Sequence, residues 1–287
     1  MYLLFDIGGT KMRLAVSEDG ATFGEPIIIS TPKNFDEGMK VFSKLSKTLS
    51  GGRMITFAGG GVPGPLDAGK SCLLASPNLS GWVGKPLRAS IQVAVGAPTF
   101  LENDTAIVGL GEAVHGAGRG YAITVYVTIS TGVNGVRIVD GVIDRNAFGF
   151  EIGHQVIAFS AHGTKDGDLP ICLNCPVPGH LEAYVSGTAI AKRYGKKPYD
   201  IHDEAIWDTV ARHLAYGLNN TIVHWSPHIV VLGGSMMKEI GIPLDRVQHH
   251  LRETLTIFPV LPDLKKAELK DIGGLYGALA FLKQKNR

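Results

Sequence analysis

The chain has little cysteine and no long hydrophobic run. Its 287 residues include three cysteines, Cys72, Cys172 and Cys175, an odd number that is too small for a disulfide framework. Apolar runs such as residues 122–129 are strand-sized, well short of the roughly 18 residues that a membrane-spanning helix needs. Asp6 interrupts the stretch where a signal peptide would be apolar. We therefore expect a cytoplasmic protein that has no membrane partner.

An excess of charge of one sign is also absent. The 28 Lys and Arg residues nearly balance the 26 Asp and Glu residues, which leaves a net charge of +2. The basic residues are scattered along the chain, so nucleic acid is not an expected partner. Apolar residues make up 45% of the chain and charged residues 19%, a composition typical of a folded protein and not of a disordered one. The length is enough for about two domains.

Glycine, in contrast, is abundant. The chain contains 37 glycines, nearly twice the usual share of about 7%, so many backbone positions are kept free of side chains. Two turns that carry glycine, residues 7–11 and residues 131–135, each connect two apolar segments. The second half of the chain thus repeats the pattern of the first.

The alternation of apolar and polar residues predicts a mixture of strands and helices. Asn34, with Glu37 three residues later, resembles a helix capping box, and Gly51 with Gly52 ends the helix that follows. The predicted strands lie at 2–6, 12–17, 26–30, 54–58, 99–101, 122–130, 136–139 and 228–232, and the predicted helices at 35–49, 105–114, 206–222 and 275–282.

Two similar halves of this kind predict two α/β domains with a cleft between them, and such clefts are where small ligands bind. We place the domain boundary at the glycine-rich segment 116–120. The N-terminal domain is then 1–116, joined by the final helix at 274–286, and the C-terminal domain is 117–273.

Two glycine motifs resemble nucleotide-binding signatures but lack the surrounding structure. Residues 64–71 match the Walker A pattern G-x-x-x-x-G-K-[ST], yet only residues 72–76 separate them from Pro77, too few for the helix that a P-loop needs. Residues 116–120 resemble a dinucleotide fingerprint but precede their strand instead of following it. We expect neither motif to bind a nucleotide.

The turns at 7–11 and 131–135 are better candidates for a phosphate site. A turn without bulky side chains lets backbone N–H groups approach a polyphosphate, and Asp6 can orient a magnesium-bound water. Taken alone, the first turn is equally typical of a type I′ hairpin. The occurrence of two such turns favours a phosphate clamp.

Asp104 follows an apolar strand at the point where the next helix begins. A helix N-terminus favours the ionised carboxylate, which is the form that accepts a proton from a substrate hydroxyl. The alternative is that Asp104 only caps the helix. Five further polar residues in glycine-flanked loops suit a ligand with many hydroxyl groups. They are Asn78, Asn103, Glu151, His154 and Glu182.

Two cysteines and two histidines form a potential metal-binding pattern. Cys172 and Cys175 are followed by His180, and His154 precedes them in a loop at 154–180. Four such ligands suit a closed tetrahedral zinc site. The alternatives are a redox pair or two buried thiols.

Taken together, these motifs resemble the ROK family, which contains sugar kinases and repressors. The resemblance spans nearly the whole chain. It rests, in family order, on residues 6–11, 61–66, 77–82, 102–104, 151–154, 179–182, 186–187 and 231–235. It implies two RNase H-like domains of the actin-like ATPase fold with a sugar bound in the cleft between them. It also implies an ATP-dependent hexose kinase that uses Mg²⁺ and forms a homodimer.

The resemblance further implies roles for individual residues. Asp104 is similar to the general base that activates the sugar hydroxyl. The positions similar to sugar-holding residues are Gly61, Asn78, Asn103, Asp104, Glu151, His154 and Glu182. The positions similar to the phosphate loops and the adenosine site are Asp6, Gly8, Gly9, Thr10, Lys11, Thr131, Gly132, Gly233 and Gly234.

The chain departs from the family pattern at the metal site. The usual C-x-C-G-x-x-G-C-x-E becomes C-x2-C-x4-H-L-E, so Cys175 and His180 fall on family cysteine positions and Cys172 lies one residue early. Both changes preserve ligand capacity. We expect a structural zinc ion held by these three residues and His154.

Glucose is the expected substrate because Glu151, His154 and Glu182 resemble the set found in glucokinases. N-acetylglucosamine, N-acetylmannosamine, mannose and fructose remain alternatives, since one or two loop residues decide whether an acetamido group fits. A non-catalytic, sugar-sensing regulator is the alternative from a different class. Such regulators resemble this chain with a helix-turn-helix domain added in front, and because the first strand begins at Tyr2 we expect no such domain.

Overall fold

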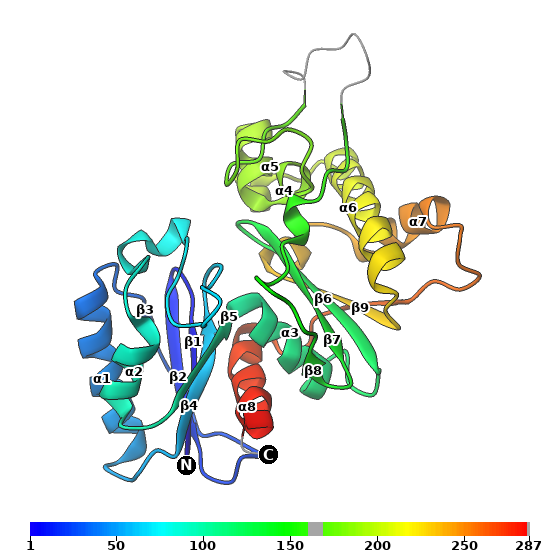
Figure 1. The fold of residues 1–287 in the computed structure, drawn as a ribbon. Helices are drawn as coiled ribbons and strands as arrows, with labels where there is room; N and C mark the ends of the chain where they lie inside the picture. Colours follow the sequence, from blue (N-terminus) through cyan, green and yellow to red (C-terminus); the bar gives the residue numbers. More distant parts are fainter. Residues whose placement is uncertain (160–168, 286–287) are drawn as a thin grey trace. The chain divides into compact units, whose positions relative to one another are not determined.

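The computed structural model describes residues 1–159 and 169–285 (Figure 1). Parts of the predicted zinc loop, 160–168, and the last residue of the predicted segment 274–286 lie outside the described residues. The chain divides into two compact units. Unit 1 comprises Met1–Arg119, Gly141–Gly149 and Leu269–Arg287, and unit 2 comprises Gly120–Asp140 and Phe150–Glu268.

Unit 1 is built on a five-stranded sheet. In sheet order its strands are β3 (Ile27–Ser30), β2 (Lys11–Ser17), β1 (Tyr2–Ile7), β4 (Phe57–Val62) and β5 (Thr99–Asn103), and the short strand β8 (Val142–Ile143) also lies in unit 1. β1 pairs antiparallel with β2 and parallel with β4, and β4 pairs parallel with β5. The carboxyl ends of β1, β4 and β5 therefore meet at one edge of the sheet.

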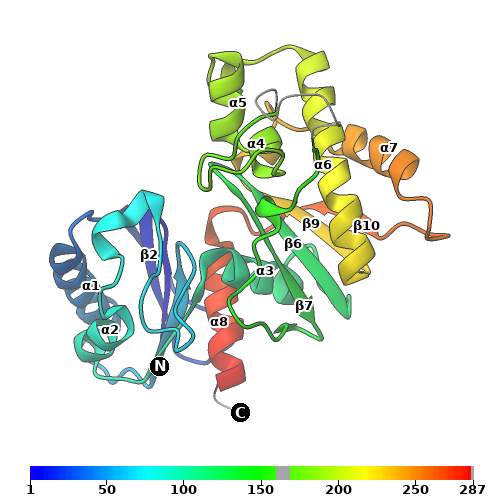
Figure 2. The same cartoon turned by 45° about the horizontal axis from the view of Figure 1, so that its top comes forward.

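Helices cover both faces of this sheet. They are α1 (Phe35–Ser50), α2 (Leu87–Val95), α3 (Asp104–His115) and α8 (Gly273–Lys285), with short 3₁₀ turns η1 (Pro77–Trp82) and η6 (Lys270–Ile272). α1 packs with α2 on one face, and α3 packs with α8 on the other (Figures 1 and 2). Leu275, Leu279 and Leu282 of α8 are fully buried, which confirms the predicted final helix within the described residues.

The predicted first helix is confirmed as α1. The Asn34 side chain accepts a hydrogen bond from the Glu37 N–H at 3.0 Å, and Gly51 ends the helix in the left-handed conformation with φ 57°. Phe42 on the buried face packs edge-on against Phe5 of β1, with ring centroids 5.5 Å apart. The capping residues thus set the length of the helix, and its aromatic face attaches it to the sheet.

The prediction of a strand at 54–58 is wrong in position, because β4 begins at Phe57 and continues to Val62. Residues 59–61 are all glycine and resemble a loop in composition. They are nevertheless strand residues, and the reason is space: a Cβ at Gly60 would overlap the carbonyl of Phe5 on the neighbouring strand. Close packing of this kind leaves no periodic signal in the sequence.

Unit 2 contains a second sheet with a similar plan. In sheet order the strands of this second sheet are β10 (Asp263–Lys266), β9 (Ile229–Gly233), β6 (Ile123–Ile129), β7 (Val133–Val139) and the short strand β8. β6 pairs antiparallel with β7 and parallel with β9, and β9 pairs parallel with β10. A hairpin next to a parallel strand thus occurs in both units, as the repeated sequence pattern predicts.

The helical elements of unit 2 are α4 (Glu182–Val185), α5 (Gly187–Tyr194), α6 (Glu204–Trp225) and α7 (Leu244–Thr254), with 3₁₀ turns η2 (Ile152–His154), η4 (Pro198–Asp200) and η5 (Ser235–Met237). α6 confirms the predicted long helix. Its buried positions Val210, Leu214 and Leu218 repeat every four residues and join the core of the unit. α7 packs against α6.

Several short elements have no counterpart in the sequence prediction. They are α2, α4, α5, α7, β8 and β10. β10 reads Asp-Leu-Lys-Lys, and only Leu264 in it is buried, so the apolar pattern is too short to be recognised. Residues 64–71 lead to the 3₁₀ turn η1 and not to the α-helix that a P-loop needs, as the short spacing to Pro77 predicts.

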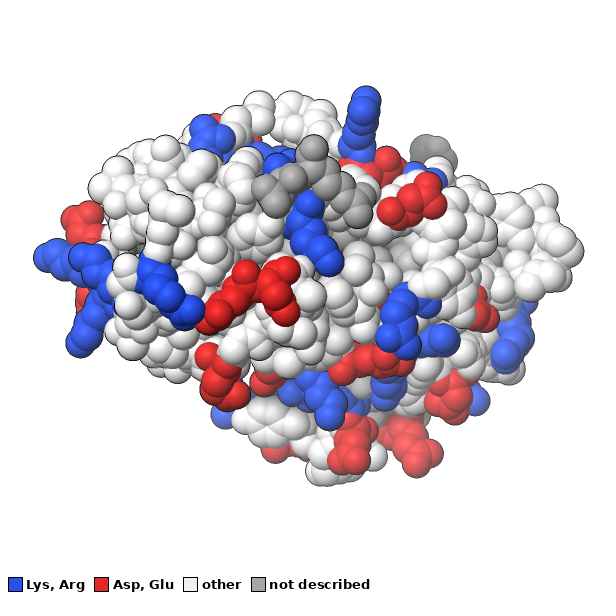
Figure 3. Space-filling view, turned by 90° about the horizontal axis from the view of Figure 1, so that it is seen from below, with Lys and Arg blue, Asp and Glu red and all other residues white. Residues whose placement is uncertain are grey.

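Within the described residues, none of the helices combines the length and apolar character needed to cross a bilayer. On the face shown in Figure 3, basic and acidic side chains lie interspersed. The visible face therefore carries no broad surface of one charge.

Candidate active site

The turn between β1 and β2 is closed by a hydrogen bond from the Gly8 N–H to the Lys11 carbonyl at 2.8 Å. Neither Gly9 nor Thr10 has a positive φ, which a type I′ turn requires at both central positions, so that alternative is wrong. Thr31 stabilises the turn through two hydrogen bonds. Its hydroxyl donates to the Gly8 carbonyl at 2.7 Å, and its N–H donates to the Thr10 carbonyl at 2.9 Å.

Asp6 lies near the end of β1 and is buried. Burial raises the pKa of its carboxyl group, and the ion pair with Arg13, 3.0 Å from Nη1 to Oδ2, opposes that rise. Gly274 at the start of α8 makes room for the carboxylate, because a Cβ there would lie 2.6 Å from Asp6 Cγ. An anionic oxygen at this edge is the ligand type that Mg²⁺ and its water shell prefer, so Asp6 fits the predicted role.

Asp104 is the first residue of α3, directly after β5. The helix is capped by Asn103, whose side-chain oxygen accepts a hydrogen bond from the Ala106 N–H at 3.2 Å, so the alternative that Asp104 is the cap is wrong. Asp104 Oδ1 accepts from the Thr105 N–H at 2.7 Å, and the helix N-terminus stabilises its negative charge. Gly61 permits the close approach of β4, since a Cβ there would lie 2.8 Å from Asp104 Cα.

Unit 1 brings most of its predicted site residues to the carboxyl edge of the sheet. Gly61 and Asp104 meet there, and Asn103 Nδ2 donates to the Gly64 carbonyl at 3.2 Å. Asn78 on η1 lies against the glycine turn, because a Cβ at Gly9 would overlap Asn78 Cβ. The carboxyl ends of parallel strands are the usual position of ligand sites in α/β sheets.

The equivalent turn of unit 2, residues 130–132, is held by hydrogen bonds from its flanks. The Ser130 N–H donates to the Gly132 carbonyl at 2.8 Å, and the Thr188 hydroxyl donates to the Thr131 carbonyl at 2.7 Å. The hydroxyls of Ser130 and Ser235 lie 3.1 Å apart. The turn is therefore fixed beside the end of β9.

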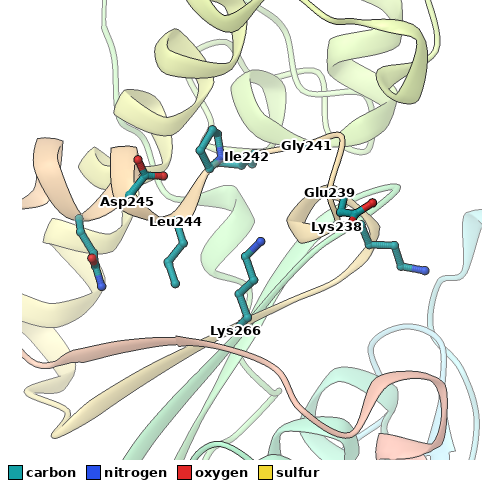
Figure 4. Close-up of a pocket in the computed structure, with 9 residues that line it drawn as sticks. Lys238, Glu239, Gly241, Ile242, Leu244, Asp245 and Lys266 are labelled. Carbon is teal, nitrogen blue, oxygen red and sulfur yellow. The ribbon is translucent and has the colours of Figure 1, made fainter.

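β9 ends in the predicted Gly233–Gly234 pair. Gly234 has φ 93°, and a Cβ there would overlap the Ile129 carbonyl, so only glycine fits. A pocket of about 500 Å³ opens farther along this segment (Figure 4). Lys266 points from the end of β10 toward Ile242 in this pocket. Its lining residues are Lys238, Glu239, Gly241, Ile242, Pro243, Leu244, Asp245, Gln248 and Lys266.

The four predicted metal ligands lie together in unit 2. Nδ1 of His154 is 3.2 Å from Sγ of Cys175 and 3.4 Å from Nδ1 of His180. Cys175 Sγ and His180 Nδ1 are 3.1 Å apart. All four ligand atoms, including Cys172 Sγ, lie within 4.8 Å of one another. Tetrahedral zinc with bonds of about 2.0–2.3 Å places its ligands roughly 3.3–3.8 Å apart, so the set fits this metal.

Burial shifts the pKa values of two of these four side chains, Cys172 and His180. Burial raises the pKa of the Cys172 thiol to about 11, so this group is a neutral thiol at pH 7 unless a cation compensates the thiolate. Burial lowers the pKa of His180, which favours the neutral imidazole that binds metals.

Glu182 links this ligand set to the turn of unit 2. Its carboxylate is buried; Oε2 accepts from the Val133 N–H at 2.9 Å and Oε1 from Asn174 Nδ2 at 2.6 Å, with Cys172 Sγ 3.4 Å from Oε1. Glu151, also predicted for the sugar, is exposed at the start of η2. Asn174 is not among the predicted site residues, because a single amide in a loop leaves no periodic or spacing signal in the sequence.

The sequence model of the ROK family matches residues 2–285. The chain belongs to the ROK family. The predicted fold class, an α/β protein with two RNase H-like domains of the actin-like ATPase fold, is confirmed by the two mixed sheets and by the structural similarity described next.

Similarity to individual ROK proteins extends over nearly the full length. The chain is 28% identical to the glucokinase of Thermotoga maritima over 316 residues, which covers 98% of this chain and 96% of that protein. It is 29% identical to the N-acetyl-D-glucosamine kinase of Escherichia coli over 305 residues, which covers 98% of this chain and 99% of that protein. The crystal structure of the ROK hexokinase of Thermus thermophilus superimposes with a TM-score of 0.82 at 27% identity, covering 100% of this chain and 99% of that one.

Proposed function

We propose that this ROK protein is a sugar kinase that transfers the γ-phosphoryl group of ATP to a hexose hydroxyl, with glucose as the preferred hexose. The observation that carries the proposal is the placement of Asp104. Asn103 is the N-cap of α3, and Asp104, the next residue, lies beside Gly61 at the sheet edge that also carries the glycine turn 8–11. The similarity to kinases of glucose and of N-acetylglucosamine supports the same reaction class.

In this reaction Asp104 is the general base. The sugar hydroxyl gives its proton to the Asp104 carboxylate while its oxygen bonds to the γ-phosphorus, and the bond from that phosphorus to the bridging oxygen of ADP breaks. The hydrogen bond from the Thr105 N–H to Oδ1 holds the carboxylate in one orientation. Asn78 and Asn103 are assigned to hold the sugar on this unit. Positioning supplies most of the rate in such transfers.

We assign the nucleotide to the glycine turns. The turn 8–11 of unit 1, apart from the Gly8 N–H that donates to the Lys11 carbonyl, and Thr131–Gly132 of unit 2 would present backbone N–H groups to the phosphates. The pocket beyond Gly233–Gly234, about 500 Å³, is within the range that nucleosides and drug-sized ligands occupy, and we assign adenosine to it. When bound, Mg²⁺ neutralises charge on the phosphates, and Asp6 would hold it through water.

Unit 2 supplies the remaining contacts assigned to the sugar, through Glu151, His154 and Glu182. Glu182 already accepts hydrogen bonds through both oxygens, which fixes its carboxylate in one orientation. This set resembles that of glucokinases and is the basis for glucose as the first choice. N-acetylglucosamine, N-acetylmannosamine, mannose and fructose are the competing substrates.

The decisive experiment is ADP release by the purified protein with ATP, Mg²⁺ and each of these five sugars in turn. We expect the highest kcat/KM with glucose. A higher value with another sugar would correct the substrate, and no sugar-dependent ADP release with any of them would favour the non-catalytic regulator. The homodimer implied by the family resemblance is a separate proposal, and sedimentation equilibrium at micromolar protein tests it.

We also propose one structural zinc ion per chain at His154, Cys172, Cys175 and His180. Zinc would hold together the loop from which Asn174 bonds to Glu182. Cys175→Ser should remove the metal and lower the melting temperature, whereas Cys72→Ser, at a cysteine outside the cluster, should leave both unchanged. Metal analysis of the purified proteins and thermal unfolding with and without chelator measure this. Equal zinc content in the two variants would contradict the assignment.

A further inference from the structure

A single lysine joins the glycine turn of unit 1 to the loop that carries Asn78. The Lys33 ammonium donates to the Gly9 carbonyl at 2.6 Å and to the Asn78 carbonyl at 2.8 Å. The two acceptors are 69 positions apart in the chain (78 minus 9), so the contact is entirely a product of the fold. Hydrogen bonds from a charged donor are stronger than those between neutral groups.

The segment that carries Lys33 is itself fixed on both sides. Thr31 bonds to the glycine turn through its hydroxyl and its N–H. The Pro32 carbonyl accepts a hydrogen bond from Trp82 Nε1 at 3.0 Å, at the other end of η1 from Asn78. Residues 31–33 therefore contact both the turn and η1, and Lys33 is the residue that contacts both at once.

The direction of these hydrogen bonds bears on ligand binding. A trans peptide points its carbonyl and the following N–H in opposite directions. Holding the Gly9 carbonyl toward Lys33 therefore directs the Thr10 N–H away from Lys33. Holding the Asn78 carbonyl likewise fixes the backbone from which the Asn78 side chain projects. Gly9 and Asn78 are also in steric contact, since a Cβ at Gly9 would overlap Asn78 Cβ.

We propose that Lys33 is a positioning residue that couples the phosphoryl-donor turn to the sugar-holding loop. This proposal rests on the proposed function in one respect, namely that the turn binds ATP phosphates and Asn78 binds the sugar. Lys33 touches neither substrate in this proposal. It holds the two binding elements at one separation, so that a sugar and a nucleotide favour each other's binding and the transfer geometry is set before the ligands arrive.

The test compares Lys33→Met with Lys33→Arg and with Lys40→Met, which removes another exposed lysine, from α1. The first readout needs no activity: hydrogen exchange of the backbone amides in 8–11 and 78–80. Lys33→Met should speed exchange in both segments at least about fivefold, and Lys40→Met should not. The melting temperature of each variant shows whether the whole fold has changed instead.

The second readout is the coupling between ligands. Sugar affinity is measured by calorimetry with and without a non-hydrolysable ATP analogue, together with kcat and KM. We expect Lys33→Met to bring the ratio of the two sugar affinities toward 1 and to lower kcat about tenfold or more with a smaller change in KM. Lys33→Arg should retain more of the ligand coupling and of kcat than Lys33→Met does, because the guanidinium also donates to carbonyls but with a different geometry.

The possible outcomes separate this proposal from the proposed function. If Lys33→Met and Lys40→Met give the same exchange rates, the bridge has no positioning role and the inference is overturned. It is also overturned if exchange changes but coupling and kcat do not. If the wild-type protein releases no ADP with any sugar, the proposed function fails, and the exchange comparison still decides whether Lys33 joins the two segments.

Discussion

The role of Asp104 is decided by the residue next to it. Asn and Asp are both good helix caps, and the structure gives the capping position of α3 to Asn103. Asp104 is thereby left at the first helical position, where the N-terminal end of the helix dipole stabilises a carboxylate. An ionised carboxylate at this place is what the proposed reaction requires of its base.

We therefore predict that Asp104→Asn lowers kcat by about 10²–10⁴-fold, the range that loss of a general base produces. Sugar affinity should change only a few-fold, because the amide keeps the size and one acceptor of the carboxylate. ADP release measures the first quantity and calorimetry the second. Asp36→Asn makes the same chemical change in the first turn of α1 and should behave as wild type. Turnover retained in Asp104→Asn would place the base elsewhere.

At the scale of elements, glycine decides where β4 can lie. Its neighbours approach so closely that a side chain at Gly60 would overlap the Phe5 carbonyl of β1. Gly61, one residue on, brings the start of α3 and its Asp104 close to the strand. The strand that looks least like a strand in composition is thus the one that positions the proposed base.

We predict that Gly60→Ala lowers the free energy of unfolding by at least about 2 kcal/mol, because the added methyl group must push two backbone strands apart. Gly24→Ala serves as the control: its Cβ would meet nothing closer than the Val16 carbonyl at 4.0 Å, and its φ is not positive. Urea unfolding of both variants measures the difference. Equal stability of the two variants would show that β1 and β4 can accommodate a methyl group between them without loss of stability.

At the scale of the whole molecule, the two units share one plan. In each, an antiparallel hairpin with a glycine in its tip lies beside a parallel strand that carries glycine at its end, Gly61 in β4 and Gly233 in β9. Each unit contributes one phosphate turn in the proposed reaction. Stability at this scale also depends on buried titratable groups, and His213 on α6 is one of them.

Burial lowers the pKa of His213 from 6.5 to about 4, and nearby Arg193 and Arg212 add to the effect. The unfolded chain therefore binds a proton between pH 6.5 and 4 that the folded chain does not, so stability falls as the pH is lowered through this window. His213 accounts for at most about 3 kcal/mol of this loss. The ring of Tyr184 packs against the His213 imidazole, with the two ring centroids 4.6 Å apart.

The corresponding experiment is chemical unfolding of wild type and His213→Gln at pH 7 and pH 4.5. The glutamine variant should lose less stability on acidification than wild type, because it has no imidazole to protonate. His224→Gln, at an exposed histidine of the same helix, should follow wild type. An unchanged pH dependence in His213→Gln would show that the pKa of this imidazole is the same in the folded protein as in the unfolded chain.

Elements that bury a regular apolar face were predictable from the sequence. α1 and α6 carry both a cap and a repeating apolar stripe, so their position followed from local physics alone. β4, α7 and β10 did not follow, because their burial depends on neighbours distant in the chain. The same distinction applies to the site residues. Asp104 and the metal ligands belong to motifs that can be recognised in the sequence, whereas Lys33 and Asn174 are identified only by their hydrogen bonds in the folded protein.

By itself, the sequence determined the family, the two glycine turns and the residue types of the site, since turn chemistry and helix caps act over a few neighbouring residues. Only the tertiary structure decided that Asn103 is the cap, that residues 59–61 are strand, and that Lys33 bonds to both Gly9 and Asn78. Those outcomes depend on space and partners supplied by segments far away in the chain, and no local pattern records them.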